Sequence, residues 1–484
     1  MRLDKIIISA VMILCGCSSL DFFSYRENTG LLTIEKPEGY GSIKFGARLA
    51  SSSTAGTDYM AVSGGEGQQV VLYKLTDEAK LDNLDSPWKR YPVNKDKDKV
   101  LPETGAGASL AGLPVFFNNG KRVEGVLAIG QPISNSVMLF RPFDDKQVAF
   151  KSSNKQTGFG RVVSAIRPGV LDQWSLAVAS NNGFEVVSDG LKSKNKGETY
   201  YRTRTDPVSK IGGKENLVSA LAGGWFGVVD QPDRLFVAAT VSHDSDAGQV
   251  RIFGTDSADA RAFSQIGCLT AADENGFGAS LLAADMDGDG IDELLVGSST
   301  ENAVHIFNVQ TVWDVSQATK GCLTLGEDID PLSTLKPEEG EWDVTCEKDC
   351  AFGTALALGE IATDNDGPEL AVGAPGADVE GSNKAGAVYI YRGFEFEAED
   401  DGLTEVTGGK LVGQVMTSSP KSDNRFGKSV IIAPAGGRSE LIVGAPGAGK
   451  AYVVFCTDVG EDIEKGADVT HDGDGKTVST RCRL

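Results

Sequence analysis

One short stretch of the chain has side chains whose type and spacing suit a divalent cation. Residues 285–293 read DMDGDGIDE, with carboxylates at alternate positions (Asp285, Asp287 and Asp289) and Gly290 at the sixth position. Alternating carboxylates converge on one hard cation, and the glycine allows the sharp turn that such a loop needs. Only oxygen ligands are available, which favours Ca²⁺ over transition metals. The alternative is an acidic turn that binds no metal.

Residues of the types used in hydrolytic catalysis are scarce. The three histidines are His243 in a polar stretch, His305 in an apolar stretch and His471 in an acidic one. His305 alternates with Val304 and Ile306, which places it on the other face of a strand. The sequence contains no G-x-S-x-G, H-E-x-x-H or P-loop motif. We therefore expect no catalytic residues and no enzymatic activity.

Charge and composition narrow the class of protein further. The 484 residues include 46 Lys and Arg against 68 Asp and Glu, for a net charge of −22. Such a negative surface repels phosphate backbones, so we expect no nucleic-acid partner. The 59 glycines favour many tight turns between short strands over long helices.

An internal repeat supplies the elements that must position the acidic loop. The clearest copies have a Phe-Gly start, an apolar strand, a turn, a second strand ending near Val-Gly, and a third strand ending in an aromatic residue. Fainter copies follow the same order, although the second starts with Ala-Gly and the fourth has lost Phe-Gly. A variable segment, such as residues 410–416, can form a fourth strand. Repeated short antiparallel strands predict an all-β fold, a seven-bladed β-propeller of four-stranded blades, with a linear β-solenoid as the alternative. The seven copies start at Phe45, Ala106, Phe159, Val218, Phe277, Phe352 and Phe426.

These copies resemble FG-GAP repeats, the units of the integrin α-subunit propeller and of many bacterial surface proteins. Gly373-Ala374-Pro375 and Gly444-Ala445-Pro446 carry that family's Gly-Ala-Pro motif, and the resemblance covers residues 31–456. It implies that an N-terminal strand, here at residues 31–34, completes the last blade. The tail, residues 457–484, exceeds what the fold needs.

The resemblance also implies a structural calcium loop in the fifth copy. The bound ion would tie a turn between two strands, and we expect Asp292 to face solvent. The implied ligands are the side chains of Asp285, Asp287 and Asp289, the carbonyl group of Ile291 and the closing side chain of Glu293.

The equivalent loop of the sixth copy is degraded. Asp364 and Asp366 remain, but Ala362 stands where the first ligand should be. We expect this loop to be one residue shorter, with Glu369 as its closing ligand. The sequence therefore predicts a weak or empty metal site here.

The N-terminus has the features of an export signal. Two basic residues precede a short apolar run, too short to span a bilayer. Its end, LCGC at residues 14–17, resembles the lipobox of bacterial lipoproteins, which implies cleavage after residue 16 and acylation of Cys17. Residues 17–30 would be an acylated tether, and the protein would be extracytoplasmic, anchored by lipid to the outer membrane or cell surface. The alternative is an ordinary cleaved signal of a secreted protein.

Six further cysteines in an oxidising compartment predict disulfides rather than free thiols. Six cysteines allow 15 pairings, and a zinc site is poorly supported because CEKDC has no second cysteine pair nearby. Their order in the chain suggests the pairs Cys268–Cys322, Cys346–Cys350 and Cys456–Cys482.

Function follows from the resemblance more than from any single motif. FG-GAP propellers chiefly bind proteins or glycans, which implies a non-catalytic, surface-displayed binding or adhesion module, attached to the membrane through its lipid. Long segments such as residues 82–103 and 310–350 would supply partner-specific loops or be solvated filler. The alternatives are an envelope scaffold subunit and a propeller-based hydrolase or lyase.

Overall fold

The computed structural model describes most of the repeat region, and the predicted acylation site and signal segment lie outside the described residues. Within the described residues, no helix is long and apolar enough to cross a membrane. The described residues are 29–40, 44–54, 57–65, 69–75, 89–91, 105–118, 121–142, 146–152, 157–166, 174–181, 183–188, 201–204, 217–228, 236–243, 246–255, 263–271, 276–286, 288–319, 321–337, 344–347, 349–361, 368–398, 404–417, 419–435, 438–456 and 482–483.

The strands form four-stranded antiparallel blades, which confirms the all-β prediction. We name each blade by its first strand. The β2 blade contains β2 (Arg48–Thr54), β3 (Thr57–Ser63), β4 (Val70–Leu75) and β5 (Lys89–Tyr91). The β6 blade contains β6 (Leu110–Asn118), β7 (Lys121–Gln131), β8 (Ser136–Arg141) and β9 (Lys146–Lys151). The β10 blade contains β10 (Val163–Ile166), β11 (Ser175–Ser180), β12 (Gly183–Ser188) and β13 (Tyr201–Arg204).

The same order continues along the chain. The β14 blade contains β14 (Leu217–Gly224), β15 (Phe236–His243), β16 (Asp246–Thr255) and β17 (Phe263–Thr270). The β18 blade contains β18 (Phe277–Ala284), β19 (Glu293–Ser298), β20 (Ala303–Phe307) and β22 (Ser333–Leu335). The β24 blade contains β24 (Ala355–Gly359), β25 (Glu369–Ala374), β27 (Ala387–Ala398) and β28 (Thr404–Val415). The β29 blade contains β29 (Ser429–Ala435), β30 (Arg438–Ala445), β31 (Lys450–Cys456) and β1 (Thr29–Glu35).

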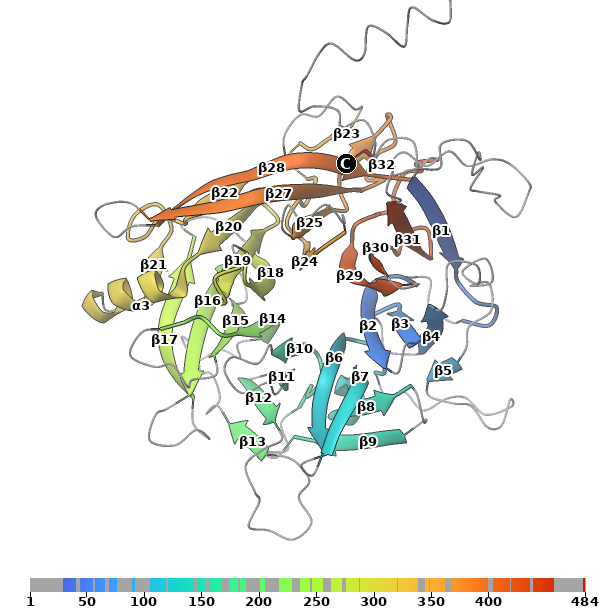
Figure 1. Ribbon diagram of the computed structural model, residues 1–484, viewed down its shortest axis with the longest axis horizontal. Coiled ribbons are helices and arrows are strands. Elements are labelled where there is room, and N and C mark those ends of the chain that lie inside the picture. Colours follow the sequence, from blue (N-terminus) through green and yellow to red (C-terminus); the bar gives the residue numbers. More distant parts are fainter. Residues whose placement is uncertain are drawn as a thin grey trace, which may run out of the picture.

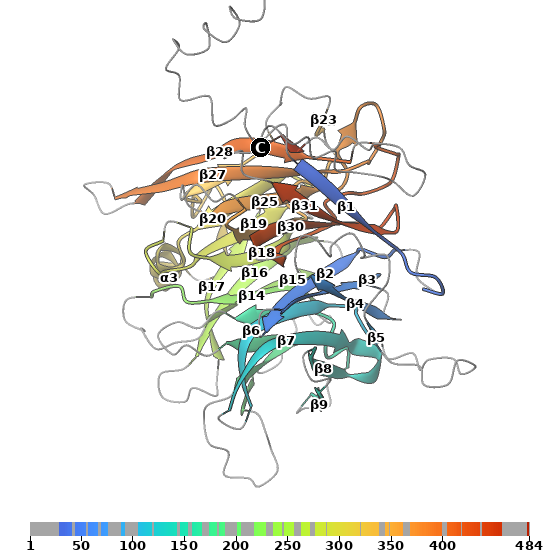
Figure 2. The ribbon, with the colours of Figure 1, turned by 45° about the vertical axis from the view of Figure 1, so that its right-hand side comes forward.

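The blades are arranged as a ring. In Figure 1 the first strand of each blade lies nearest the centre. Each first strand contacts the next one along the chain, and β29 contacts β2, so the ring closes. β1 pairs with β31 over its whole length, as the N-terminal strand was predicted to do, and Figure 2 shows the two side by side. The last blade is therefore built from both ends of the repeat region.

The middle strands are buried on both faces because neighbouring blades pack against each other. β19 and β25 are buried at every residue. Along β19, Leu294 and Val296 belong to a core shared with the β14 blade, whereas Leu295 belongs to a core shared with the β24 blade. One strand thus contributes alternate side chains to two cores.

The same hydrogen bond joins three of the blades to the blade that follows each of them. A serine three residues after the first residue of one copy donates to the carbonyl of the Phe-Gly glycine in the following copy. Ser280 Oγ donates to the Gly353 carbonyl oxygen at 2.7 Å, and Ser429 Oγ donates to that of Gly46 at 2.8 Å. The second of these bonds joins the last blade to the first, so closure uses the same contact as a join between successive blades.

The Val-Gly glycine lies against the same carbonyl group, which predicts a cost for any side chain there. A Cβ at Gly444 would overlap the Gly46 carbonyl oxygen, whereas at Gly254 it would lie 3.1 Å from the Phe236 ring. We expect Gly444→Ala to lower the free energy of unfolding by about 1–3 kcal/mol, and Gly254→Ala to cost less because a ring edge moves more easily than backbone. Urea unfolding measures both, and equal costs would contradict the closure contact.

The fourth copy, in which Phe-Gly is lost, is joined to its neighbour in a different way. β10 and β14 form a parallel bridge between Ile166 and Gly223, and this merges their two blades into one nine-stranded sheet together with β21 (Leu323–Thr324). Phe226 follows β14 and is buried, so the pair Phe226-Gly227 does not start a copy. At this boundary the two blades are joined by a bridge between strands. The start of the fourth copy is therefore hard to find from the Phe-Gly motif.

The two long segments predicted as loops contain structure. Each supplies the outermost strand of its blade, β5 or β22, and residues 310–350 also include most of α3 (Val309–Ala318), all of β21 and β23 (Val344–Thr345). β21 pairs in parallel with β17, and β23 pairs with β26 (Asp378–Val379). These segments therefore contribute strands to the blades and are not only loops between them.

Candidate calcium loop and its equivalents

The loop that joins β18 to β19 is folded around its own carboxylates. Asp285 accepts hydrogen bonds from the backbone N–H groups of Gly288 at 2.8 Å and Gly290 at 3.1 Å. Asp289 accepts one from the N–H of Ile291 at 2.6 Å. Gly290 has φ of +91°, in the left-handed region, so a glycine at the sixth position is required by the backbone as predicted.

Glu293 lies at the closing position of the loop and is only 3% exposed. It is the first residue of β19, and its Oε2 accepts a hydrogen bond from the N–H of Met286 at 3.1 Å. Ile291 is half-buried, and Asp287 lies outside the described residues. Among the described residues, no three carboxylate, imidazole or thiol groups converge. The donor set nevertheless consists of oxygen atoms only, which is the chemistry that suits Ca²⁺.

Asp292 does not face solvent, contrary to the expectation from the sequence. It is 1% exposed, and its Oδ2 accepts a hydrogen bond from the backbone N–H of Trp225 at 2.8 Å. The N–H of Asp292 donates to the Trp225 carbonyl at 2.8 Å. This residue therefore ties the loop to the β14 blade, a contact that depends on a residue far away in the sequence.

Strand register corrects the alignment of the sixth copy. Ala284 pairs with Glu293 in the β18 blade, and Gly359 pairs with Glu369 in the β24 blade. The first loop position is therefore taken by Glu360 and not by Ala362. The loop from 360 to 368 is one residue longer than the loop from 285 to 292, not one residue shorter. Asp364 and Asp366 lie outside the described residues.

Glu369 itself is held by an arginine. The carboxylate is 1% exposed, and its Oε1 accepts hydrogen bonds from Arg392 Nε at 3.0 Å and Nη2 at 2.8 Å. Its Oε2 accepts one from the N–H of Ile361 at 2.7 Å, the counterpart of the Met286 bond to Glu293. A guanidinium group therefore neutralises the closing carboxylate of this loop.

A third copy of the closing carboxylate was not predicted from the sequence. Ala433 pairs with Glu440 in the β29 blade, and Glu440 is 4% exposed. A sequence signal did exist: Glu293, Glu369 and Glu440 are each followed by Leu-x-Val-Gly. The closing carboxylate thus persists in the last copy even though its turn lacks the carboxylate series.

His305 faces the interior of its blade. It is 2% exposed on β20, Nδ1 lies 3.0 Å from Thr334 Oγ1, and Nε2 lies 2.9 Å from a Glu301 carboxylate oxygen. Thr334 is its cross-strand neighbour on β22. The imidazole therefore joins two strands through hydrogen bonds. His243 ends β15 rather than lying in a loop, and His471 lies outside the described residues.

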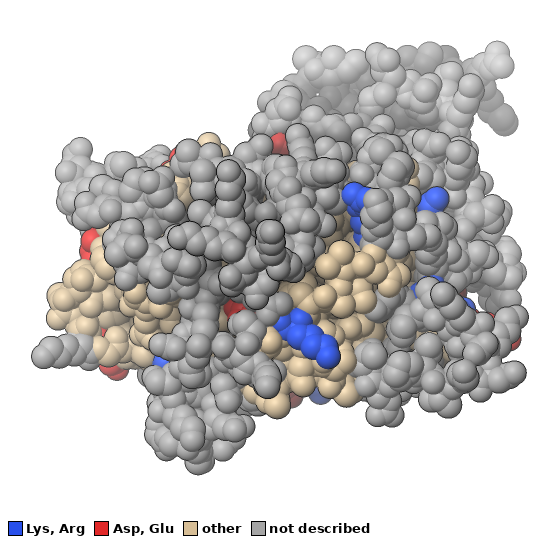
Figure 3. Space-filling view, turned by 90° about the horizontal axis from the view of Figure 1, so that it is seen from below, with Lys and Arg blue, Asp and Glu red and all other residues tan. Residues whose placement is uncertain are grey.

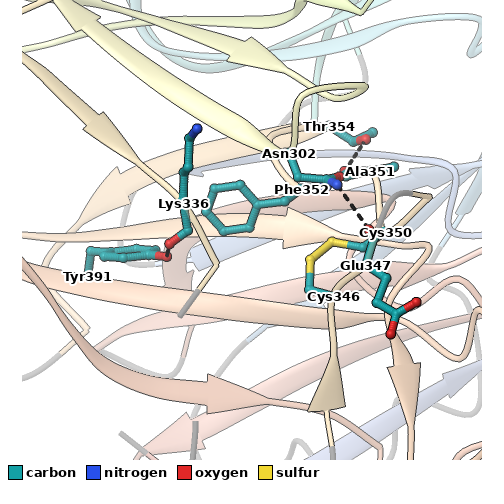
Figure 4. The surroundings of a disulfide bond; sticks show 9 residues. All are labelled: Asn302, Lys336, Cys346, Glu347, Cys350, Ala351, Phe352, Thr354 and Tyr391. Atoms are coloured by element: carbon teal, nitrogen blue, oxygen red, sulfur yellow. Dashed lines mark hydrogen bonds between the residues drawn. A yellow bond between two sulfur atoms is a disulfide. The ribbon is translucent and has the colours of Figure 1, made fainter. Parts of the chain in front are cut away.

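Two of the three predicted disulfides are present. Cys268 on β17 is bonded to Cys322, and Cys346 is bonded to Cys350. The second bond closes a small loop just before Phe352, and Asn302 holds that loop to the β18 blade (Figure 4). The Asn302 side-chain amide donates to the Glu347 carbonyl at 3.0 Å and accepts from the Phe352 N–H at 3.2 Å.

The pairing of Cys456 with Cys482 stays a prediction, since the side chains of both lie outside the described part. The backbone of β32 (Cys482–Arg483) pairs with β28, with Cys482 opposite Val415. The end of the tail is therefore placed at the outer edge of the β24 blade.

Comparisons with known proteins match one stretch of the repeat region to a family. Residues 277–312, which span β18, β19, β20 and the start of α3, match the family described as FG-GAP repeat. Two solved structures are similar over 88% of this chain and 98% of theirs, each with a TM-score of 0.44. They are described as "Structure of U3-55K", 9% identical, and "Crystal structure of RRP9 WD40 repeats", 8% identical. The acidic loop lies inside the residues that match the FG-GAP repeat, and around it four-stranded antiparallel blades form a ring, as in a β-propeller.

Proposed function

We propose that this protein is a non-catalytic, seven-bladed propeller that displays a binding surface for a protein or glycan partner outside the cytoplasm. The observation that carries the proposal is the FG-GAP match at residues 277–312, set in a ring whose ends are joined by β1. The seven proposed blades are those named above by their first strands: β2, β6, β10, β14, β18, β24 and β29. A closed ring is rigid, so loops at its two ends keep fixed positions for a partner.

The partner is tested by capture on the intact protein. Envelope proteins and a glycan array would be probed with purified protein in calcium and in EDTA. Saturable binding of one protein or glycan class supports the proposal. Turnover of glycosidic or peptide bonds in the captured material would favour the hydrolase or lyase alternative. Retention of only envelope-complex subunits would favour the scaffold.

The anchor part of the proposal rests on the sequence alone. Acylation at Cys17 would hold the protein to the outer membrane or cell surface, because several acyl chains together anchor firmly. Cys17→Ala should move the protein from the membrane fraction to the soluble fraction, as followed by immunoblotting. An unchanged distribution would argue for attachment by another route.

Calcium is proposed as a structural ion in the loop between β18 and β19. Asp285, Asp289 and Glu293, with Asp287 and the Ile291 carbonyl, would hold it, and the ion would offset the repulsion among these carboxylates. By mass action, bound calcium stabilises the fold by about 2.7 kcal/mol when its concentration is 100 times Kd. The ion's role is to fix a turn rather than to react.

Chelation is the direct test of the calcium site. EDTA should lower the melting temperature of the wild type, and Asp289→Ala should lower it in calcium and abolish the response to EDTA. Asp330→Ala, which removes an exposed carboxylate elsewhere, should keep the response. Differential scanning fluorimetry measures all three proteins. A wild-type melting curve that is the same in EDTA and calcium would remove the assignment.

A further inference from the structure

Three basic side chains lie where the last blade meets the first. Arg48 begins β2, Lys428 immediately precedes β29, and Arg425 lies three residues before Lys428. The hydrogen bond from Ser429 to Gly46 joins these two segments, which are about 380 residues apart in the chain. All three residues are at the end of the ring where the first strands begin, which we call the Phe-Gly face.

Arg48 and Lys428 lie at the starts of two first strands that contact each other where the ring closes, and the N–H of Lys428 donates to the Arg425 carbonyl at 3.2 Å. Burial lowers the pKa of the Lys428 ammonium group, and the positive charges of Arg48 and Arg425 lower it further. Burial also lowers the pKa of the Arg48 guanidinium, although that side chain still reaches water. Like charges held together at the edge of the protein destabilise the fold unless an opposite charge lies nearby.

Among the described residues, carboxylates do little to neutralise this cluster. In the described part of the chain, neither Arg48 nor Lys428 forms an ion pair. Arg48 instead donates to the carbonyl groups of Ala108 at 3.3 Å and Ala47 at 3.0 Å. Arg425 lies 3.8 Å from Asp423, and these side chains are 56% and 71% exposed, so the pair contributes little. This is unexpected in a chain with 68 acidic residues.

On the side that Figure 3 shows, the described Lys and Arg side chains form separate small groups. A net charge of −22 would repel a long polyanion. A compact anion can approach a local cluster without meeting that repulsion over a large area, because salt screens charges beyond about 10 Å.

We propose that Lys428 and Arg48, with Arg425 at the edge, bind a tetrahedral oxyanion, the phosphate or sulfate group of a small ligand, on the Phe-Gly face. The free N–H groups of the guanidinium can donate to two oxygens, and the ammonium group supplies a mobile point charge. The inference goes beyond the proposed function, and the probe is an inorganic ion. Its failure therefore leaves the proposed partner binding untouched.

Inorganic phosphate and inorganic sulfate are the probes, titrated separately into the full-length protein at constant ionic strength set with chloride. Isothermal titration calorimetry should show saturable binding of at least one, weakened about tenfold or more by Lys428→Met, as expected for a charge-assisted contact. Lys410→Met makes the same charge change on the exposed outer strand β28 and should bind like the wild type. Stronger binding of sulfate or of phosphate identifies the natural ester.

Thermal unfolding keeps the test decisive if affinity is too weak for calorimetry. Without phosphate or sulfate, Lys428→Met should raise the melting temperature, because it removes repulsion. With either ion, the wild type should gain stability and Lys428→Met should not. The proposal would be overturned if either ion stabilised the wild type and Lys428→Met equally. It would also be overturned if a long sulfated polysaccharide bound the protein and Lys410→Met and Lys428→Met weakened that binding equally. If Lys428→Met does not fold, Arg48→Gln replaces it with the same expected loss of binding.

Discussion

Replacing Arg392 by methionine is expected to lower the free energy of unfolding by about 3–5 kcal/mol. The reason is that its ion-pair partner, Glu369, is buried. Glu369 is almost fully buried, with one oxygen bound to two guanidinium nitrogens and the other to the Ile361 N–H. Methionine has similar length but no charge, so the carboxylate would remain buried without its cation. The measurement is urea unfolding followed by tryptophan fluorescence at neutral pH.

A double variant separates the lost charge from lost packing. In Arg392→Met with Glu369→Gln, the buried charge is gone, and most of the stability should return. Glu369→Gln alone should cost less than Arg392→Met because Arg392 is 16% exposed and its charge can still reach water. A single Arg392→Met variant as stable as the wild type would show that the ion pair contributes nothing to this blade.

Removing the bridge between Cys268 and Cys322 is the second change with a large expected effect. The two cysteines are 54 residues apart, and the chain-entropy treatment assigns about 4 kcal/mol to a loop of this length. Cys268 lies on β17, and Cys322 immediately precedes β21, which pairs with β17. The bond therefore fastens α3 and its flanking segments to the outer edge of the β14 blade.

The other disulfide is a matched control within the same protein. Cys346 and Cys350 are four residues apart, so the same treatment assigns only about 2 kcal/mol to their bond. Cys268→Ala with Cys322→Ala should thus lower the urea midpoint more than Cys346→Ala with Cys350→Ala. The reverse order would indicate that local docking of the small loop through Asn302, and not chain entropy, governs its contribution.

The candidate calcium loop shows which single residues could be placed correctly from the sequence. The required Gly290 and the closing position of Glu293 were predicted, because both depend on the local course of the chain between two strands. Asp292 was predicted to face solvent but is buried. Its hydrogen-bond partner, Trp225, belongs to another blade, and no local pattern could reveal it.

The sixth copy shows a different limit. Its loop was aligned by residue type, and this placed Ala362 at the first position. Strand register places Glu360 there, because an insertion inside a turn leaves no trace in composition. Arg392 carries no motif either: it reaches Glu369 only because β25 pairs with β27. Pairing between strands therefore decided that the buried carboxylate of Glu369 meets a guanidinium group.

The sequence by itself determined the repeat, the all-β fold, the strand that completes the last blade and two of the disulfides. The repeat and the all-β fold follow from patterns that recur along the chain, because a repeated pattern folds into a repeated unit. The strand that completes the last blade was implied by the family resemblance, and the disulfides were suggested by the order of the cysteines. The tertiary structure alone decided which polar side chains are buried and what they meet. Arg48 and Lys428 come together only when the ring closes. Burial and charge at a join between blades depend on the neighbouring blade, and the local sequence does not contain that neighbour.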